Sequence, residues 1–225
     1  TPGGVWSSQS GRYENLNVSV PAKADDAVSF ELRPGVNAVR SIVSLQQMCL
    51  FTSNAEHTVK GGGVTDFITP ASIVQKRYSR RGSTALDALV VGDLALFVQR
   101  RGALIRAFGY SFEKDGFTTN DLTLLAPHLF AGHTIVDWCY QEYPHAVVWI
   151  VRDDGVLLSL TFVAEQNVIA FARHYIGGSF GSTDWGIVES ATCIPGSTED
   201  EVYLVVKRTI NGQTKRYIEM LLPRW

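Results

Sequence analysis

The hydrophobic residues of this chain gather in short runs, each followed by a polar turn and a second, more mixed run. Four segments repeat this design, which predicts four antiparallel hairpins. Their first strands, turns and second strands are Met48–Phe51, Ser53-Asn54 and Ala55–Val59; Leu94–Val98, Arg101-Gly102 and Ala103–Tyr110; Val147–Val151, Asp154-Gly155 and Val156–Phe162; and Val202–Val206, Asn211-Gly212 and Thr214–Leu221.

The turns support this interpretation and give it a period. Asp-Gly and Asn-Gly are strong hairpin signals, because a type I′ turn needs positive φ at both central residues. The turns recur at positions 54, 102, 155 and 212, at intervals of 48, 53 and 57 residues. Propeller blades place four strands in about 40–50 residues, so the interval favours blades.

The two strands of each hairpin differ in polarity. The first is apolar at nearly every position, as expected for a strand covered on both faces. The second is more mixed, and in the fourth hairpin Lys215, Arg216 and Glu219 interrupt it. We therefore expect the first strand to lie between neighbouring blades and the second to be outer and partly solvated.

Other segments complete the expected blades. Further strands are expected at Val39–Leu45, Ile135–Tyr140, Ile187–Ile194 and Val168–Tyr175, with an earlier blade represented by Val5–Ser8 and Ala27–Leu32. The segments Ser10–Asp26, Gly61–Pro70 and Gly177–Gly186 favour loops. Helix is expected only as one turn over Asn120–Ala126, stopped by Pro127.

The predicted fold is all-β: a β-propeller or partial propeller of about four to five blades, built mostly from antiparallel hairpins. We expect a single propeller-like domain over residues 1–225. Because the chain opens at Thr1 with no initiator Met, we also expect it to be a processed chain or a fragment of a longer protein.

Composition excludes several classes of protein. A hydrophobic content of 45% across 225 residues supplies a sizeable core, and the formal charge of −2 argues against a dedicated nucleic-acid binder. No apolar run is long enough to span a membrane, and no secretory leader opens the chain. Cys49, Cys139 and Cys193 are expected to be free thiols, because their number and spacing suit neither a disulfide framework nor a zinc site.

One stretch is locally basic, in contrast to the chain as a whole. Between Lys76 and Arg106 there are seven Lys or Arg residues against two Asp residues. Clustered arginine suits an acidic protein partner or a phosphate group, and a plain solvated surface is the alternative. The candidate contact residues are Arg77, Arg80, Arg81, Arg100 and Arg101.

Motifs that suggest catalysis do not meet their structural requirements. Gly177–Gly181 matches G-x-S-x-G, but the sequence after it starts no helix, and a nucleophile elbow needs one. His128, His133 and Asp137 lie close in sequence but match no zinc-ligand spacing. We expect no catalytic residue, no metal and no cofactor, and therefore no enzyme.

Several separated runs resemble one known family. These runs are Trp6–Leu16, Phe97–Gly102, Asn120–Phe130, Arg208–Thr214 and Arg216–Glu219. In the same order, they resemble the tail tubular protein B, or nozzle, family of short-tailed bacteriophages and related prophages.

The resemblance implies a structural protein of the virion tail, made in the bacterial cytoplasm, with propeller-like β architecture. Members of that family form a ring, typically a hexamer, below the head–tail adaptor, and fibres or spikes attach nearby. Genomic DNA leaves through the central channel, so no sequence-specific DNA binding and no membrane are implied. Family members are usually longer than this chain, so the resemblance implies a fragment of a longer tail protein, and the family brings no catalytic motif.

An alternative function belongs to another class. Some propellers bind or hydrolyse glycans, and acidic pairs such as Asp153-Asp154 leave this interpretation open. A deep pocket that holds two carboxylates and stacked tryptophans would favour it.

Overall fold

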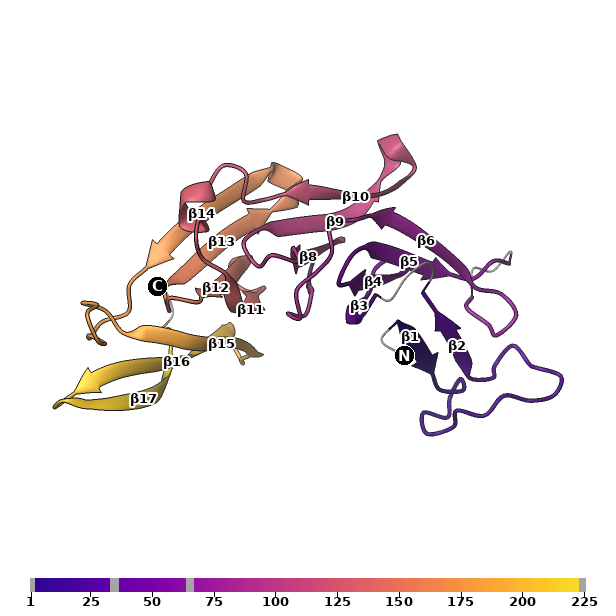
Figure 1. The fold of residues 1–225 in the computed structure, drawn as a ribbon, viewed down its shortest axis with the longest axis horizontal. Coiled ribbons are helices and arrows are strands. Elements are labelled where there is room, and N and C mark those ends of the chain that lie inside the picture. Colours follow the sequence, from indigo (N-terminus) through magenta and orange to yellow (C-terminus); the bar gives the residue numbers. More distant parts are fainter. Residues whose placement is uncertain (1–2, 33–36, 64–66, 223–225) are drawn as a thin grey trace. The chain divides into compact units, whose positions relative to one another are not determined.

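The computed structural model describes residues 3–32, 37–63 and 67–222 and contains five antiparallel sheets (Figure 1). The strands are β1 (Gly4–Ser7), β2 (Val28–Glu31), β3 (Val39–Ser44), β4 (Met48–Thr52), β5 (Glu56–Lys60), β6 (Val74–Ser79), β7 (Leu89–Val91), β8 (Leu94–Val98), β9 (Ile105–Ser111), β10 (Gly116–Asp121), β11 (Ile135–Gln141), β12 (Val147–Arg152), β13 (Leu157–Val163), β14 (Val168–His174), β15 (Ile187–Pro195), β16 (Asp200–Ile210) and β17 (Gln213–Met220). Three single-turn 3-10 helices are η1 (Phe112–Lys114), η2 (Pro127–Leu129) and η3 (Ala164–Gln166). No helix in the described ranges is long and apolar enough to cross a membrane.

Each sheet is built from strands that are consecutive in the sequence. The sheets are β1-β2, β3-β4-β5-β6, β10-β9-β8-β7, β11-β12-β13-β14 and β15-β16-β17. The all-β prediction is therefore confirmed, and so are the four hairpins, at β4–β5, β8–β9, β12–β13 and β16–β17. The chain also divides into two compact units, residues 1–100 with 108–119 and residues 101–107 with 120–225.

Of the two turns with an Asp-Gly or Asn-Gly pair, only the one in the fourth hairpin has the backbone that type I′ requires. There, Asn211 has φ 50° and Gly212 has φ 74°, as the prediction requires. At Asp154-Gly155 only the glycine has positive φ, 76°. The N–H of Gly155 donates to the carbonyl of Arg152 at 2.9 Å, and the N–H of Arg152 donates to the carbonyl of Val156 at 3.1 Å. The third hairpin therefore has a longer loop than a two-residue turn.

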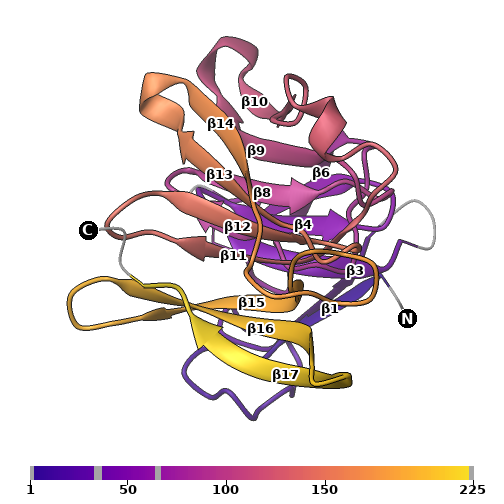
Figure 2. The ribbon, with the colours of Figure 1, turned by 90° about the vertical axis from the view of Figure 1, so that its left-hand side faces the viewer.

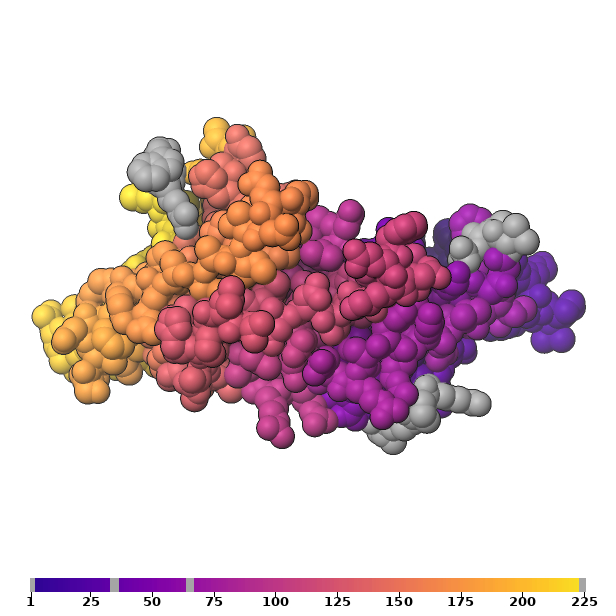
Figure 3. Space-filling view, turned by 90° about the horizontal axis from the view of Figure 1, so that it is seen from above, coloured from indigo at the N-terminus to yellow at the C-terminus, as the bar shows by residue number. Residues whose placement is uncertain are grey.

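In three of the four hairpins, the second strand is more buried than its polarity suggested. β5, β9 and β13 are buried over most of their length, and only β17 is solvated as predicted. The reason is a further strand, β6, β10 or β14, at the outer side of each four-stranded sheet. The atoms of β14, orange in Figure 3, lie at the surface, which agrees with the exposed or half-buried state of all its residues.

The prediction of a helical turn over Asn120–Ala126 is wrong. Asn120 and Asp121 end β10, and the Asp121 carboxylate accepts hydrogen bonds from the backbone N–H and the hydroxyl of Thr123 at 2.9 and 2.7 Å. This side-chain turn competes with helix. The helical turn in this region, η2, begins at Pro127 rather than ending before it, because proline suits the first helical position. The strand expected over Val168–Tyr175 is confirmed by β14.

The first unit is organised around four phenylalanines. Phe51, Phe97 and Phe108 are fully buried, and Phe117 stacks on Phe108 with 5.1 Å between ring centroids. Phe51 contacts both Phe97 and Phe108, with centroids 5.0 and 5.5 Å apart. These rings come from β4, β8, β9 and β10, so they join the β3–β6 sheet to the β7–β10 sheet.

In the second unit, the β11–β14 and β15–β17 sheets share a core. Trp149, Val151 and Leu157 of the first sheet pack with Val188, Leu204 and Val206 of the second. Figure 2 shows the two sheets one above the other, with β11 next to β15. In β16 only alternate residues are buried, so one face of the last sheet packs on the core and the other is more open.

Backbone hydrogen bonds join the hairpin of one sheet to the start of the next, and this joint repeats along the chain. The carbonyl of Thr52 accepts from Ser83 at 2.8 Å, that of Gly102 from Ile135 at 2.7 Å, and that of Gly155 from Val188 at 3.0 Å. The glycines make close approach feasible, because a Cβ on Gly155 would overlap the side chain of Ile187.

A second recurring contact runs from the first strand of one sheet to the start of the next sheet. The register shifts in β3 after Val39, in β11 after Ile135 and in β15 after Val188, as a β-bulge does. In the second unit, the residue after the bulge is Asp137, whose carboxylate accepts from Ser190 Oγ at 2.5 Å and from the N–H of Ala191 at 3.0 Å. In the first unit, the corresponding Ser41 Oγ accepts from the N–H of Ala88 at 3.0 Å.

Candidate functional site

A strongly charged hollow of the first unit lies between β6 and β10. Four cationic side chains line it: Lys76 on β6, Arg80 and Arg81 just after β6, and Lys114 in η1. The hollow, here called the basic groove, has a volume of about 620 Å³. Tyr78, Ser79, Asp115 and the β10 residues 116–119 form the rest of its lining.

Aromatic contacts fix the floor of the basic groove. The Tyr78 ring packs edge-on against Phe117, with centroids 5.3 Å apart, and so holds β6 beside β10. The ammonium of Lys76 lies 4.7 Å from the Tyr78 ring centroid, within the range of a cation–π contact. A Cβ at Gly116 would lie 2.9 Å from the Tyr78 ring, so glycine permits this approach.

A buried carboxylate holds the backbone of the arginine pair. Glu56 is fully buried, and its Oε2 accepts a hydrogen bond from the hydroxyl of Ser79. The same oxygen accepts from the backbone N–H of Arg81 at 3.3 Å. The chain is therefore anchored on both sides of Arg80, while the side chains of Arg80 and Arg81 remain exposed.

The charges of the basic groove are not balanced locally. Within the described residues, Lys76, Arg80, Arg81 and Lys114 form no ion pair. Asp115 is the one carboxylate in the lining, and it accepts a hydrogen bond from the Tyr110 hydroxyl at 2.8 Å. That bond raises the pKa of Tyr110. The groove therefore suits an anionic group.

The structure separates the five arginines that the sequence suggested as a contact set. Arg80 and Arg81 line the basic groove, whereas Arg77 lies on β6 outside its lining. Arg100 donates to Asn54 Oδ1 at 2.5 Å, and Arg101 belongs to the other compact unit. All five are exposed.

Two further members of the basic stretch have different environments from those expected. Arg106 is buried at 8% exposure and pairs with Asp121 at 3.4 Å, so it belongs to no surface. Lys76 lines the groove although it was not among the five candidates. Lys114 was missed because it lies outside the basic stretch and reaches the groove only through the β9–β10 connection.

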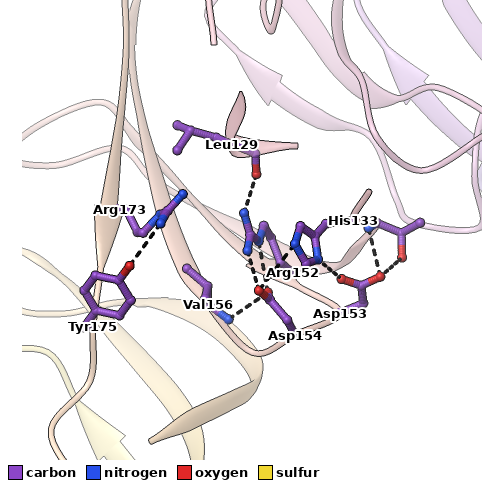
Figure 4. A network of polar contacts seen from close by, with 9 residues as sticks. Leu129, His133, Arg152, Asp153, Asp154, Val156, Arg173 and Tyr175 are labelled. Carbon is purple, nitrogen blue, oxygen red and sulfur yellow. Dashed lines mark hydrogen bonds and ion pairs between the residues drawn. The ribbon is translucent and has the colours of Figure 1, made fainter. Parts of the chain in front are cut away.

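The second unit contains a histidine–carboxylate network at the third hairpin (Figure 4). His133 Nδ1 lies 2.9 Å from Asp153 Oδ1, and its Nε2 lies 3.7 Å from Asp154 Oδ2. Arg152 pairs with Asp154 and donates through Nη1 to the carbonyl of Leu129 at 2.5 Å. His133 therefore partners Asp153 and Asp154, not the His128 and Asp137 near it in sequence.

This network could present three metal-ligand atoms within 4.8 Å of one another. However, the Arg152 guanidinium already pairs with Asp154, and Asp153 also accepts from the N–H and hydroxyl of Thr134 at 3.0 and 3.1 Å. These partners lower the pKa of both carboxylates against the opposing effect of burial. The arrangement therefore acts as a clamp between the hairpin and the segment that precedes β11.

A second cavity, of about 540 Å³, lies in the second unit. One wall is the face of β12–β14 that carries Trp149, Ser159, Thr161 and His174, and the other includes residues 198–202 and 220–222. Ser159 Oγ lies 2.8 Å from His174 Nε2, and the Trp149 and His174 rings are 5.3 Å apart.

The remaining sequence motifs are parts of the fold. Gly177–Gly181 follows β14, and the residues after it, from 182 to 222, form bends and strands but no helix. Ser179 contributes its backbone carbonyl, which accepts from the N–H of Thr209 at 2.7 Å. Cys49, Cys139 and Cys193 are free thiols, as predicted, and burial raises their pKa values to about 11, 12 and 11.

Comparison with known proteins adds no assignment: no model of a known protein family matches this chain, and no curated protein matches it.

Proposed function

We propose that this chain is a structural component of a bacteriophage or prophage tail, built as a β-propeller or part of one. In this proposal, consecutive sheets are blades, and the chain acts by packing and assembly with other tail proteins around the DNA exit channel. The viral role derives from the resemblance of five separated segments to the nozzle family.

The repeated joint between sheets is the observation that carries the proposal. Three times, the carbonyl of a hairpin accepts a hydrogen bond from a residue further along the chain: Ser83, which precedes β7, and Ile135 and Val188, which lie at the start of β11 and β15. Three sheets are four-stranded meanders in sequence order, the arrangement of a propeller blade. Stacked repeats of this kind give a rigid body, because each sheet buries its face only against its neighbour.

Electron microscopy with the neighbouring tail protein tests the viral role. The chain, and the longer protein if it is a fragment, would be mixed with the head–tail adaptor of the same genome and imaged in negative stain. Rings are expected on the adaptor. Persistent monomers under conditions where the adaptor itself forms rings would contradict the proposal.

One observation favours a second candidate function. The 540 Å³ cavity of the second unit brings together Trp149, His174 and the carboxylates of Glu199 and Glu201. A glycan site uses such groups, although Trp149 is only 5% exposed and its Nε1 donates to Gln141 Oε1 at 3.0 Å. Binding or cleavage of bacterial surface glycans, abolished by Glu201→Gln, would favour a carbohydrate-active protein over a tail component.

A further inference from the structure

We infer that the basic groove is a docking site for an extended, acidic segment of a partner protein, which lies along the free edge of β10. The inference rests on the proposed assembly function only for the source of the segment, a neighbouring tail protein. Three features support it: the strand edge that the groove faces, the charge of the groove, and the pattern of donors and acceptors that such an edge offers.

The first feature is that the groove faces a strand edge. Residues 116, 117, 118 and 119 of β10 all line it, although alternate side chains of a strand point to opposite faces. A hollow lined by four consecutive residues therefore faces the edge of the strand. β10 is the terminal strand of its sheet, and β6 is terminal in the sheet beside it, so neither edge pairs with another described strand.

The second feature is the charge. Lys76, Arg80, Arg81 and Lys114 supply four positive charges, and the lining contains one carboxylate, that of Asp115. The cationic groups without ion pairs give charge complementarity to carboxylates spaced along an extended chain. Edge strands that remain uncovered are a liability for a soluble protein, and cations at the edge discourage self-pairing while they attract acidic segments.

The third feature is the pattern of backbone donors and acceptors at the edge, which favours a peptide over a nucleic acid as the ligand. A strand edge offers N–H donors and C=O acceptors in alternation. A peptide backbone satisfies both. A phosphodiester chain offers only acceptor oxygens along its backbone, and these repel the carbonyl oxygens of the edge. Phe117 is 5% exposed and so presents no free face for a base to stack on. An added peptide strand is the general mode of recognition at such edges.

Fluorescence anisotropy with a defined probe tests the inference. The probe is a labelled peptide of about ten residues, alternating glutamate and threonine, because strands are typically of this length. It is titrated with the whole chain at low and at physiological ionic strength. We expect saturable binding that weakens as salt rises, and about ten-fold weaker binding to the Arg80→Gln/Arg81→Gln variant.

Two controls make the test specific. An Arg12→Gln/Lys215→Gln variant removes the same charge from exposed residues outside the groove and should retain the wild-type affinity. A second peptide carries the same glutamates with proline in place of threonine, so it keeps the charge but loses the N–H group of every second residue. Because every glutamate keeps its own N–H group, this peptide has lost only the N–H groups of alternate residues, together with the freedom of those residues to adopt strand geometry. It should bind several-fold more weakly than the threonine peptide, a difference that charge attraction alone does not predict.

Three results would overturn the inference: equal losses in the two charge variants, equal binding of the proline peptide, or tighter binding of a single-stranded oligonucleotide of equal charge. Thermal unfolding checks that both variants remain folded. Because ring formation with the adaptor is measured separately, a negative peptide result beside intact rings would reject this docking site and leave the proposed function standing.

Discussion

Replacement of Gly155 by alanine should destabilise the protein much more than the same replacement at Gly212. Both glycines lie in hairpin turns of the second unit and have nearly the same φ, 76° and 74°. Each substitution therefore costs about 1–2 kcal/mol for a side chain in the left-handed region. At Gly212 a new Cβ meets nothing within 4 Å.

At Gly155 the new Cβ overlaps Cγ2 of Ile187 and lies 3.1 Å from the Cα of the same residue. The backbone at the start of the next sheet must then move, and overpacking of this kind costs a further ~1–3 kcal/mol. The hydrogen bond from Val188 to the Gly155 carbonyl is strained at the same time. We therefore expect Gly155→Ala to lower the free energy of unfolding by ~2–5 kcal/mol, against about 1–2 kcal/mol for Gly212→Ala.

Urea unfolding, followed by tryptophan fluorescence, measures both losses, and Trp149 in the core of the second unit is a suitable reporter. A double variant, Gly155→Ala/Ile187→Ala, removes the overlapping side chain and should recover part of the loss, so the two changes should be non-additive. Equal destabilisation by the two alanine substitutions would refute the reasoning, because the overlap of the new Cβ with Ile187 would then cost no stability.

Other substitutions probe the cores, the joints and the titrating groups. Phe97→Ala empties the fully buried centre of the phenylalanine cluster and should cost about 3–5 kcal/mol in denaturant unfolding, whereas Phe112→Ala, at an exposed ring, should change stability little. Asp137→Asn keeps the shape of the side chain but weakens its hydrogen bonds to Ser190 and Ala191, so we expect the free energy of unfolding to fall by about 1–3 kcal/mol. The exposed Asp184→Asn should not show this loss. Burial and the nearby Arg77 lower the pKa of His57, so the unfolded state binds a proton more readily than the folded state. The free energy of unfolding should therefore fall as pH drops below about 6.5. Thermal unfolding at a series of pH values should show a weaker pH dependence for His57→Gln. Arg216 and Lys207 lower the pKa of Glu189 to about 2. The ionised Glu189 therefore contributes to the free energy of unfolding above its unfolded pKa, and this contribution is lost as pH falls from about 4.5 towards 2. In Glu189→Gln, the free energy of unfolding should depend less on pH over this range.

The hairpins could be predicted from sequence because their signals are local. An apolar run, a turn and a second run of β-formers are read within about 20 residues, and β8 was predicted with its observed bounds, Leu94–Val98. The Asn211-Gly212 turn is likewise a local property of its two residues. At Asp154-Gly155 the sequence placed the turn but not its type, because only Gly155 has positive φ there.

The outer strands and the groove escaped prediction because they depend on distant parts of the chain. β6 is polar over most of its length, with Gln75, Lys76 and Arg77 in succession, so no apolar alternation marks it. Lys114 joins Arg80 and Arg81 only because β10 returns beside β6. The hydrogen bond between Asp137 and Ser190 spans 53 residues, and no local sequence pattern predicts it.

The central claim is that consecutive sheets are repeated blades which stack through the joints at Thr52, Gly102 and Gly155. A near-atomic electron-microscopy reconstruction of the protein on its tail adaptor tests it most directly. The account predicts sheets arranged radially about one axis, each hairpin carbonyl bonded to the first residues of the following sheet. Sheets merged into one continuous layer, or hairpins separated from the sheets that follow them, would contradict it.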